Sequence, residues 1–208
     1  LWKSVNKIHS ISNDLYQLGI NWGLNPEIPM QKITPAIDTK MFKYQRKGAL
    51  RNPLQILSIG RLTWKKGFEY ALLAIRILKK EGIQFNYTII GDGDYYETLV
   101  YAIHQMKLQS NVTLLGQISH QQVKHQLEKS DIYIQASIQE GFCNSVLEAQ
   151  AMGLLCIATD AEGLSENILD GETGWIIPKR SPVSIAKKII ELQHLDINEI
   201  NRIRNKAV

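Results

Sequence analysis

Short apolar runs alternate with longer segments of helical periodicity from residue 54 onward, and this alternation constrains the fold more than any other feature of the chain. The runs lack a regular polar–apolar alternation, which is typical of strands covered on both faces in a parallel sheet with crossover helices. The sequence therefore predicts an α/β fold, a doubly wound, Rossmann-like parallel sheet. The predicted strands are 54–59, 85–90, 112–116, 131–136, 154–159 and 174–178; the predicted helices are 67–82, 94–107, 119–129, about 144–153 and one from about 182, with a turn or short helix near 164–169.

Residues 1–45 do not follow this alternation. They contain one predicted helix near 12–19 and then the segment PEIPMQKITPAID, whose three prolines resist both a helix and a central strand. The chain also begins with Leu1 and ends in a polar run without a stop signal. We therefore expect a piece of a longer protein, with residues 1–45 as the tail of a preceding domain and a linker, and residues 46–208 as the main domain.

Composition narrows the classes of function. Hydrophobic residues make up 44% of the 208 residues, enough for a full core, and no apolar run approaches the roughly 18 residues of a membrane span. The net charge of +4 mildly favours an anionic partner such as a nucleotide, a phosphate or a lipid surface.

Cys143 and Cys156 fit neither a metal pair nor a disulfide framework, so we expect free thiols. His120 and His125 are off the spacing of zinc ligands on one helical face, so we predict no metal site.

The stretch EGFCNSVLE, residues 140–148, places two glutamates on either side of a predicted helix start. Asn144 or Ser145 is the expected N-cap, and Gly153 the C-terminal stop. The backbone from Gly141 into the helix then presents N–H groups without an intrahelical partner, at the positive end of the helix dipole. Such a helix start is a binding site for phosphate.

Glu148 is expected about one turn inside this helix, with its side chain leaning toward the N-terminus. One turn is about 5.4 Å, close to the separation of phosphate and ribose in a nucleotide, so Glu148 is a candidate acceptor for ribose hydroxyls. Glu140 follows the preceding strand and faces the crevice on the other side of the diphosphate, where a carboxylate suits a sugar. The spacing alone is not specific, because two glutamates eight apart are commonly solvated helix surface.

A second segment, SIGRLTWKKGFEYA at 58–71, adds two cations at the end of another strand. The strand ends at Gly60, and Arg61 and Lys66 precede the next helix, so both side chains should reach over the carboxyl edge of the sheet. A guanidinium fork and an ammonium group suit a diphosphate whose negative charge grows as it leaves. A basic loop with solvated tips is the alternative, and Lys65 is expected to be only that.

Together these segments resemble the C-terminal half of glycosyltransferase family 4, the retaining enzymes of the GT-B fold. GRLTWKKGFEYAL is similar to the family's GRL-x-x-x-KG segment, and ASIQEGFCNSVLEAQAMG to its Glu-x7-Glu motif. IIGDGDYYETL, VTLLGQ and ATDAEGLSENILDGETGWIIP are similar to three further segments, so the resemblance spans most of the chain. It implies a transferase that moves a sugar from a UDP- or GDP-linked donor to an acceptor with retention; we expect neither a metal nor a cofactor.

The resemblance also implies roles for individual residues. Arg61 and Lys66 would be the cations at the donor diphosphate, and Glu148 the ribose ligand. Glu140 would contact hydroxyls of the transferred sugar, and it joins Arg61 and Lys66 as a predicted catalytic residue. The predicted donor site as a whole consists of Gly60, Arg61, Lys66, the base-contacting backbone of Gln117 and Ile118, Glu140, Gly141, the amides of Phe142, Cys143 and Asn144 near the phosphates, and Glu148.

The segment KITPAIDTKMF, residues 32–42, is similar to the family's interdomain linker, so residues 1 to about 35 would end an acceptor-binding N-terminal domain. The expected partners are a nucleotide sugar, the chain's own missing N-terminal domain and an acceptor that is a glycan, a lipid or a small molecule; we expect no nucleic acid. We expect a cytoplasmic protein of polysaccharide or glycoconjugate biosynthesis, with peripheral contact at the inner face of the membrane left open. The fragment alone should lack turnover.

Three positions depart from the family pattern. Cys143 stands where Gly is frequent, which matters if that residue needs a positive φ. Leu155 stands where Pro is usual, and Glu162 where Gly is common, so the choice of donor sugar is left unpredicted.

Other functions stay open at this point. Asp92-Gly93-Asp94 spells DxD, the metal-binding signature of the other large glycosyltransferase fold, although strand-to-helix turns are commonly rich in glycines and short acids. A nucleotide-sugar-binding module without catalysis is an alternative from a different class. A nucleotide-sugar epimerase of GT-B-like fold is a third, because one fold supports several chemistries.

Overall fold

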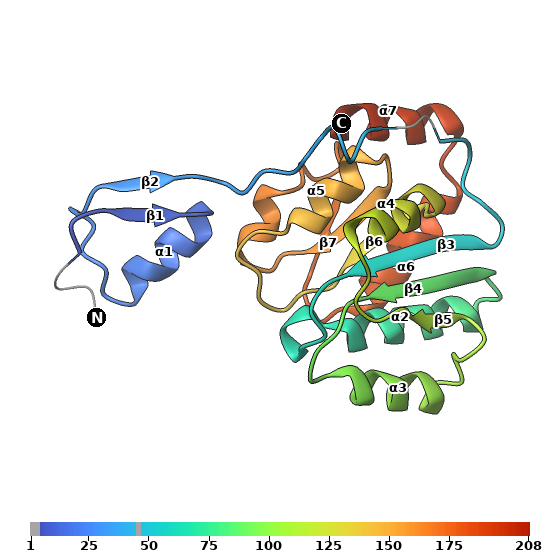
Figure 1. Ribbon diagram of the computed structural model, residues 1–208. Coiled ribbons are helices and arrows are strands. Elements are labelled where there is room, and N and C mark those ends of the chain that lie inside the picture. Colours follow the sequence, from blue (N-terminus) through green and yellow to red (C-terminus); the bar gives the residue numbers. More distant parts are fainter. Residues whose placement is uncertain (1–4, 45–46) are drawn as a thin grey trace.

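The computed structural model describes residues 5–44 and 47–208 of the chain (Figure 1). Its centre is a six-stranded sheet in which every neighbouring pair of strands is parallel, in the order β5-β4-β3-β6-β7-β8. The predicted α/β fold with a doubly wound parallel sheet is thus confirmed. The strands are β3 (Leu54–Ile59), β4 (Phe85–Ile90), β5 (Val112–Leu114), β6 (Ile132–Gln135), β7 (Leu155–Thr159) and β8 (Trp175–Ile177).

The central strands are buried on both faces, which explains why they read as unbroken apolar runs. All residues of β6 and β7 are buried. In β6, Ile132 and Ile134 belong to one core cluster and Tyr133 to another, because successive side chains of a strand point to opposite faces. In β7, Leu155 faces the first cluster, so the position where a proline is usual in the family carries an ordinary core residue here.

Helices cover both faces of the sheet. In Figure 1, α2 and α3 lie below the sheet, while α4 and α5 lie above it. The buried side chains of α2, α3 and α6 form one core cluster with the sheet, and those of α4 and α5 form the other. No helix within the described residues is long and apolar enough to cross a membrane. The helices are α2 (Phe68–Lys80), α3 (Tyr96–Gln105), α4 (His120–Lys129), α5 (Asn144–Ala151) and α6 (Pro182–Gln193), with short 3-10 helices η1 (Trp64–Lys66) and η2 (Glu162–Glu166).

The C-terminal segment forms two helices where the sequence predicted one. After α6 the chain turns, and α7 (Ile197–Ala207) begins at Asp196. The Asp196 side chain accepts from the amides of Asn198 and Glu199, and Glu199 reaches back to the Asp196 amide, which is a complete capping box. The capping box therefore starts a second helix within a segment whose helical periodicity is continuous in the sequence.

The N-terminal residues form a separate two-stranded parallel sheet with one helix. β1 (Ile8–Ser10) pairs with β2 (Met30–Lys32), and α1 (Asn13–Asn21) connects them. The predicted helix is confirmed, and β2 belongs to a two-stranded sheet, so the expectation that the prolines resist a central strand agrees with the structure. The prolines lie outside the three residues of β2, where they cost no ladder hydrogen bond.

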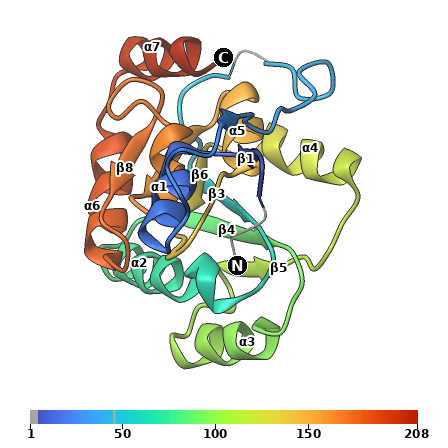
Figure 2. The same cartoon turned by 90° about the vertical axis from the view of Figure 1, so that its left-hand side faces the viewer.

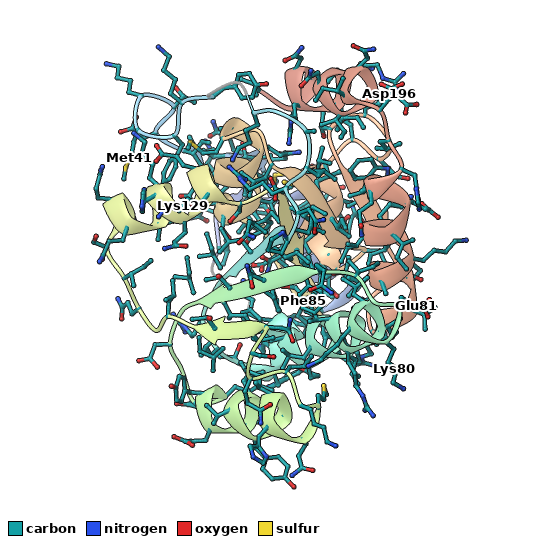
Figure 3. All side chains as sticks on the ribbon, turned by 90° about the vertical axis from the view of Figure 1, so that its right-hand side faces the viewer. Met41, Lys80, Glu81, Phe85, Lys129 and Asp196 are labelled. Carbon is teal, nitrogen blue, oxygen red and sulfur yellow. The ribbon has the colours of Figure 1, made fainter. Side chains whose placement is uncertain are left out.

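The strand order places a topological switch point between β3 and β6. From β3 the chain proceeds to β4 and β5 on one side, and from β6 to β7 and β8 on the other. The carboxyl ends of the strands point toward the N-terminal unit, and Figure 2 shows β1 and α1 in front of that edge. Figure 3 shows the opposite edge, with Phe85 at the start of β4 and Lys80 at the end of α2. In open α/β sheets, ligands bind in the crevice at the carboxyl edge by the switch point.

Candidate functional site

The loop after β3 is held close to its neighbours by glycines. Gly67 has φ +61°, and a Cβ there would lie 2.1 Å from the Ala136 carbonyl oxygen, so no side chain fits. A Cβ on Gly91 would lie 1.9 Å from the carbonyl oxygen of Gly60. The predicted Gly60 therefore packs against the glycine turn after β4, and the loop 60–67 is fixed between two other loops at the carboxyl edge.

Lys66 and Glu140 form an ion pair across the switch point. Lys66 ends η1, Glu140 follows β6, and their side chains are only 20% and 13% exposed. The Ser137 hydroxyl also donates to the Glu140 carboxylate, at 3.3 Å. The structure thus brings together two of the three predicted catalytic residues, which are 74 positions apart in the sequence. Arg61 is exposed on the same loop as Lys66.

The helix start in EGFCNSVLE is displaced by one residue from the prediction. The N-cap is Cys143, without a side-chain cap, and Asn144 is the first helical residue. The expected cap Ser145 instead donates to the Ile59 carbonyl at 3.4 Å. Asn167 compensates from another loop, since its side chain accepts from the Cys143 amide at 3.1 Å and donates to the Cys143 carbonyl at 3.3 Å.

These contacts determine which backbone amides near the start of α5 are free to bind a ligand. The Cys143 amide, predicted to lie near phosphates, is already bonded to Asn167. Within the described residues the amides of Gly141, Phe142 and Asn144 donate to no acceptor, so they are better candidates than the amide of Cys143. Cys143 has φ −121°, an ordinary extended value, so the cysteine in place of glycine strains nothing. Its thiol and that of Cys156 are free and buried.

Glu148 lies in the second turn of α5, as predicted. Burial raises the pKa of its carboxyl group, and the nearby His120 opposes that shift. His120 begins α4, directly after the loop that contains Gln117 and Ile118. Gln117 is exposed and Ile118 packs against the core cluster under α4 and α5. The loop predicted to meet the base therefore ends beside the predicted ribose ligand.

A cleft of about 870 Å³ lies between α1 and the carboxyl edge of the sheet. Four predicted residues line it: Arg61, Lys66, Glu140 and Gly141. The other predicted residues, Gly60, Gln117, Ile118, Phe142, Cys143, Asn144 and Glu148, lie outside its lining.

Several lining residues were not predicted. Leu15 and Leu18 come from α1 and Trp22 is its C-cap residue. Their spacing places them on one helical face, and that periodicity in the sequence could have identified them. Glu162 also lines the cleft, where its carboxylate accepts from the Glu140 amide at 3.3 Å and pairs with Lys179 at 3.5 Å. Glu162 could have been identified from the sequence, because it stands where the family commonly has glycine.

The DxD sequence lies in a turn with structural contacts. The Asp92 carboxylate accepts from the Gly93 amide at 2.8 Å, and the Asp92 carbonyl accepts from the Leu62 amide at 2.9 Å. A Cβ on Gly93 would lie 2.4 Å from the Leu62 carbonyl oxygen. Asp92 and Gly93 thus hold the GDG turn against the loop after β3, which gives these residues a structural explanation.

The six-stranded parallel sheet, with two motif loops meeting at its switch point, defines a doubly wound α/β domain of the kind that makes up half of a GT-B glycosyltransferase. Within that class, the chain belongs to the family of glycosyl transferases group 1, whose model matches residues 40–207. The resemblance drawn from the motifs is thereby confirmed at the level of this family.

A curated relative agrees with this assignment. The chain is 35% identical over 173 residues to the amylovoran biosynthesis glycosyltransferase AmsK of Erwinia amylovora, an alignment that covers 79% of this chain and 42% of AmsK. The chain spans less than half the length of AmsK and of other curated relatives that it matches.

Solved structures show the same fold. HepE of Anabaena, in complex with UDP and glucose, superposes with a TM-score of 0.85 at 18% identity, over 98% of this chain and 57% of HepE. The C-terminal domain of LpcC, a group 1 glycosyltransferase of Francisella tularensis, superposes with a TM-score of 0.71 at 25% identity, over 83% of this chain and 94% of that domain.

Proposed function

We propose that residues 46–208 are the donor-binding domain of a glycosyltransferase that moves a sugar from a nucleoside diphosphate to an acceptor, with retention and without a metal ion. The observation that carries the proposal is the meeting of the β3 loop and the β6–α5 loop at the switch point, where Lys66 pairs with Glu140. This crevice is where α/β domains of this class bind nucleotides. HepE, which has the same fold, holds UDP and glucose.

Different residues of the proposed site bind different parts of the donor. Arg61 and Lys66 stabilise the diphosphate as it leaves, because preorganised cations act on charge that develops in the transition state. The amides of Gly141 and Phe142 and the dipole of α5 bind the phosphate oxygens. Glu148 accepts the ribose hydroxyls.

The sugar and the base lie on either side of the phosphates. Glu140 contacts hydroxyls of the transferred sugar. When the donor binds, Lys66 leaves the Glu140 carboxylate and pairs with the diphosphate. The backbone around Gln117 and Ile118 contacts the base, since that loop ends at His120, beside the ribose ligand Glu148.

Residues 1–45 are proposed as the end of an acceptor-binding domain and the linker to the donor domain. The apolar face of α1 then forms the wall of the cleft opposite Arg61 and Lys66. AmsK is named for amylovoran biosynthesis, which favours a role for the full-length protein in polysaccharide or glycoconjugate synthesis. This chain by itself is expected to bind the donor nucleotide without transferring sugar.

Calorimetric titration of the chain with UDP, GDP and ADP in EDTA tests the function. One of UDP and GDP is expected to bind without metal, because Arg61, Lys66 and the start of α5 supply the positive potential that a divalent ion would otherwise provide. Absence of binding to a folded chain would contradict the donor-site assignment. Binding that needs Mg²⁺ would instead favour the DxD turn at Asp92 and Asp94.

The pH dependence of nucleotide binding is a second prediction. Because burial raises the pKa of Glu148 above the ordinary carboxyl value of 4.5, its carboxylate is lost at a higher pH than usual. The ribose hydroxyls need the ionised acceptor, so affinity is expected to fall as the pH is lowered through this raised pKa. Titration of Glu148→Gln across the same pH range is the control; it should keep only the dependence due to the nucleotide's own phosphate and other groups.

A further inference from the structure

The short helix η2 lies between the N-terminal unit and the donor loop, which is defined as residues 140–143. Gly163 has no room for a side chain, since a Cβ there would lie 1.8 Å from the Gly141 carbonyl oxygen and 3.1 Å from Ser12 Cβ. One backbone position therefore touches the donor loop on one side and the N-cap of α1 on the other.

Glu166, at the end of η2, binds the N-terminal unit with both carboxylate oxygens. One oxygen accepts from the amides of Asn13 at 2.6 Å and Asp14 at 3.3 Å, which are the first two amides of α1. The other pairs with Lys32 of β2 at 2.5 Å. Free amides and a positive dipole at a helix start favour such a carboxylate. The contacts join positions more than 130 residues apart in the sequence.

The next residue along the chain, Asn167, binds the donor loop. Its side-chain amide makes two hydrogen bonds to the backbone of Cys143. Consecutive residues of one short segment thus hold α1 and the start of α5. α1 and the residues just before it also contact the donor loop directly, because a Cβ on Gly141 would lie 2.7 Å from Leu15 Cδ1 and 3.2 Å from Ile11 Cδ1.

We propose that Glu166 is a positioning residue that couples the docking of α1 over the cleft to the conformation of the donor loop. The coupling rests on the proposed function in one respect, that the donor loop binds the phosphates of the nucleotide. Burial acts to raise the pKa of Glu166, but Lys32 and the two α1 amides outweigh it and lower the pKa, so the carboxylate is ionised at neutral pH. Coupling of this kind is reciprocal: a nucleotide that orders the donor loop also tightens the docking of α1.

Amide hydrogen exchange of the whole 208-residue chain tests the contact directly. In Glu166→Ala, the amides of Asn13 and Asp14 are expected to exchange about 5- to 30-fold faster, as on loss of a helix cap. Glu166→Gln keeps an acceptor oxygen and should give an intermediate rate. Glu172→Ala is the matched control, because it also removes a glutamate from an ion pair, with Lys206 at 2.9 Å, but far along the chain from α1. Wild-type exchange in Glu166→Ala would overturn the proposal.

Adding UDP or GDP tests the coupling. In the wild type the bound nucleotide should slow exchange at Asn13 and Asp14, and in Glu166→Ala this slowing should disappear while the Kd for the nucleotide changes no more than about fivefold. In the full-length enzyme the same variant should lower kcat about 10-fold. Equal losses in nucleotide affinity and kcat would show general damage to the loop and refute positioning. If neither nucleotide binds the wild type, the proposed function and the coupling both fail, whereas ligand-free exchange still decides the Glu166 contact.

Discussion

Lys66→Ala is expected to lower the turnover of the full-length enzyme by two to three orders of magnitude. Lys66 lies at the switch point, on the loop after β3. In the proposed donor site this is where the departing diphosphate would gain negative charge in the transition state. Removing one preorganised donor to such a charge costs about 100- to 1,000-fold in kcat in known enzymes. The measurement is kcat with saturating donor and acceptor, and Arg61→Ala should show an effect of the same kind.

The variant also leaves Glu140 without its cation, and a second measurement separates that effect. Glu140 is only 13% exposed, so an unpaired carboxylate there could disturb the loop. Thermal unfolding of the variant chain reports such damage, and Lys66→Arg keeps the charge and should keep more of the activity. Lys80→Ala is the matched control for loss of a lysine, since Lys80 lies at the far edge of the sheet (Figure 3). Wild-type turnover in Lys66→Ala would refute the catalytic assignment.

The fold could be predicted because its determinants are local. Leu155–Thr159 and Ile132–Gln135 are mostly apolar and show no polar–apolar alternation, a pattern that indicates strands covered on both faces. Helix ends were also readable where the signal is a glycine, as at Gly82, which has φ +75° after α2. The missed break before α7 had a local signal too, the aspartate and glutamate of its capping box.

The parts that could not be predicted depend on contacts between distant segments. The N-cap of α5 was placed one residue late because Asn167, 24 positions away, takes the role of a cap at Cys143. The pairing of Lys66 with Glu140 was not predicted either, although each residue was proposed for the site by its own motif. Nothing local in the sequence indicates that Glu166 would cap α1, since that contact needs the N-terminal unit to dock on η2.

Glu148→Ala is expected to weaken nucleotide binding by about 100-fold or more. A carboxylate that accepts two ribose hydroxyls makes two charge-assisted hydrogen bonds, each worth about 1.5–3 kcal/mol. Glu148 is partly buried in the second turn of α5, so it loses less solvation when the ribose binds than a fully exposed carboxylate would. The measurement is the Kd of whichever of UDP and GDP binds the wild-type chain, and Glu97→Ala, an exposed glutamate in the first turn of α3, is the matched control.

A 2′,3′-dideoxy nucleotide makes this test specific to the ribose. Wild-type protein should lose about as much affinity from removal of the two hydroxyls as from removal of the carboxylate, because either change breaks the same two hydrogen bonds. Glu148→Ala should bind the dideoxy nucleotide and the ordinary nucleotide almost equally. This non-additivity is the signature of a direct contact. Additive losses would mean that Glu148 supports the helix or the loop containing Gln117 and Ile118, and that the ribose is bound elsewhere.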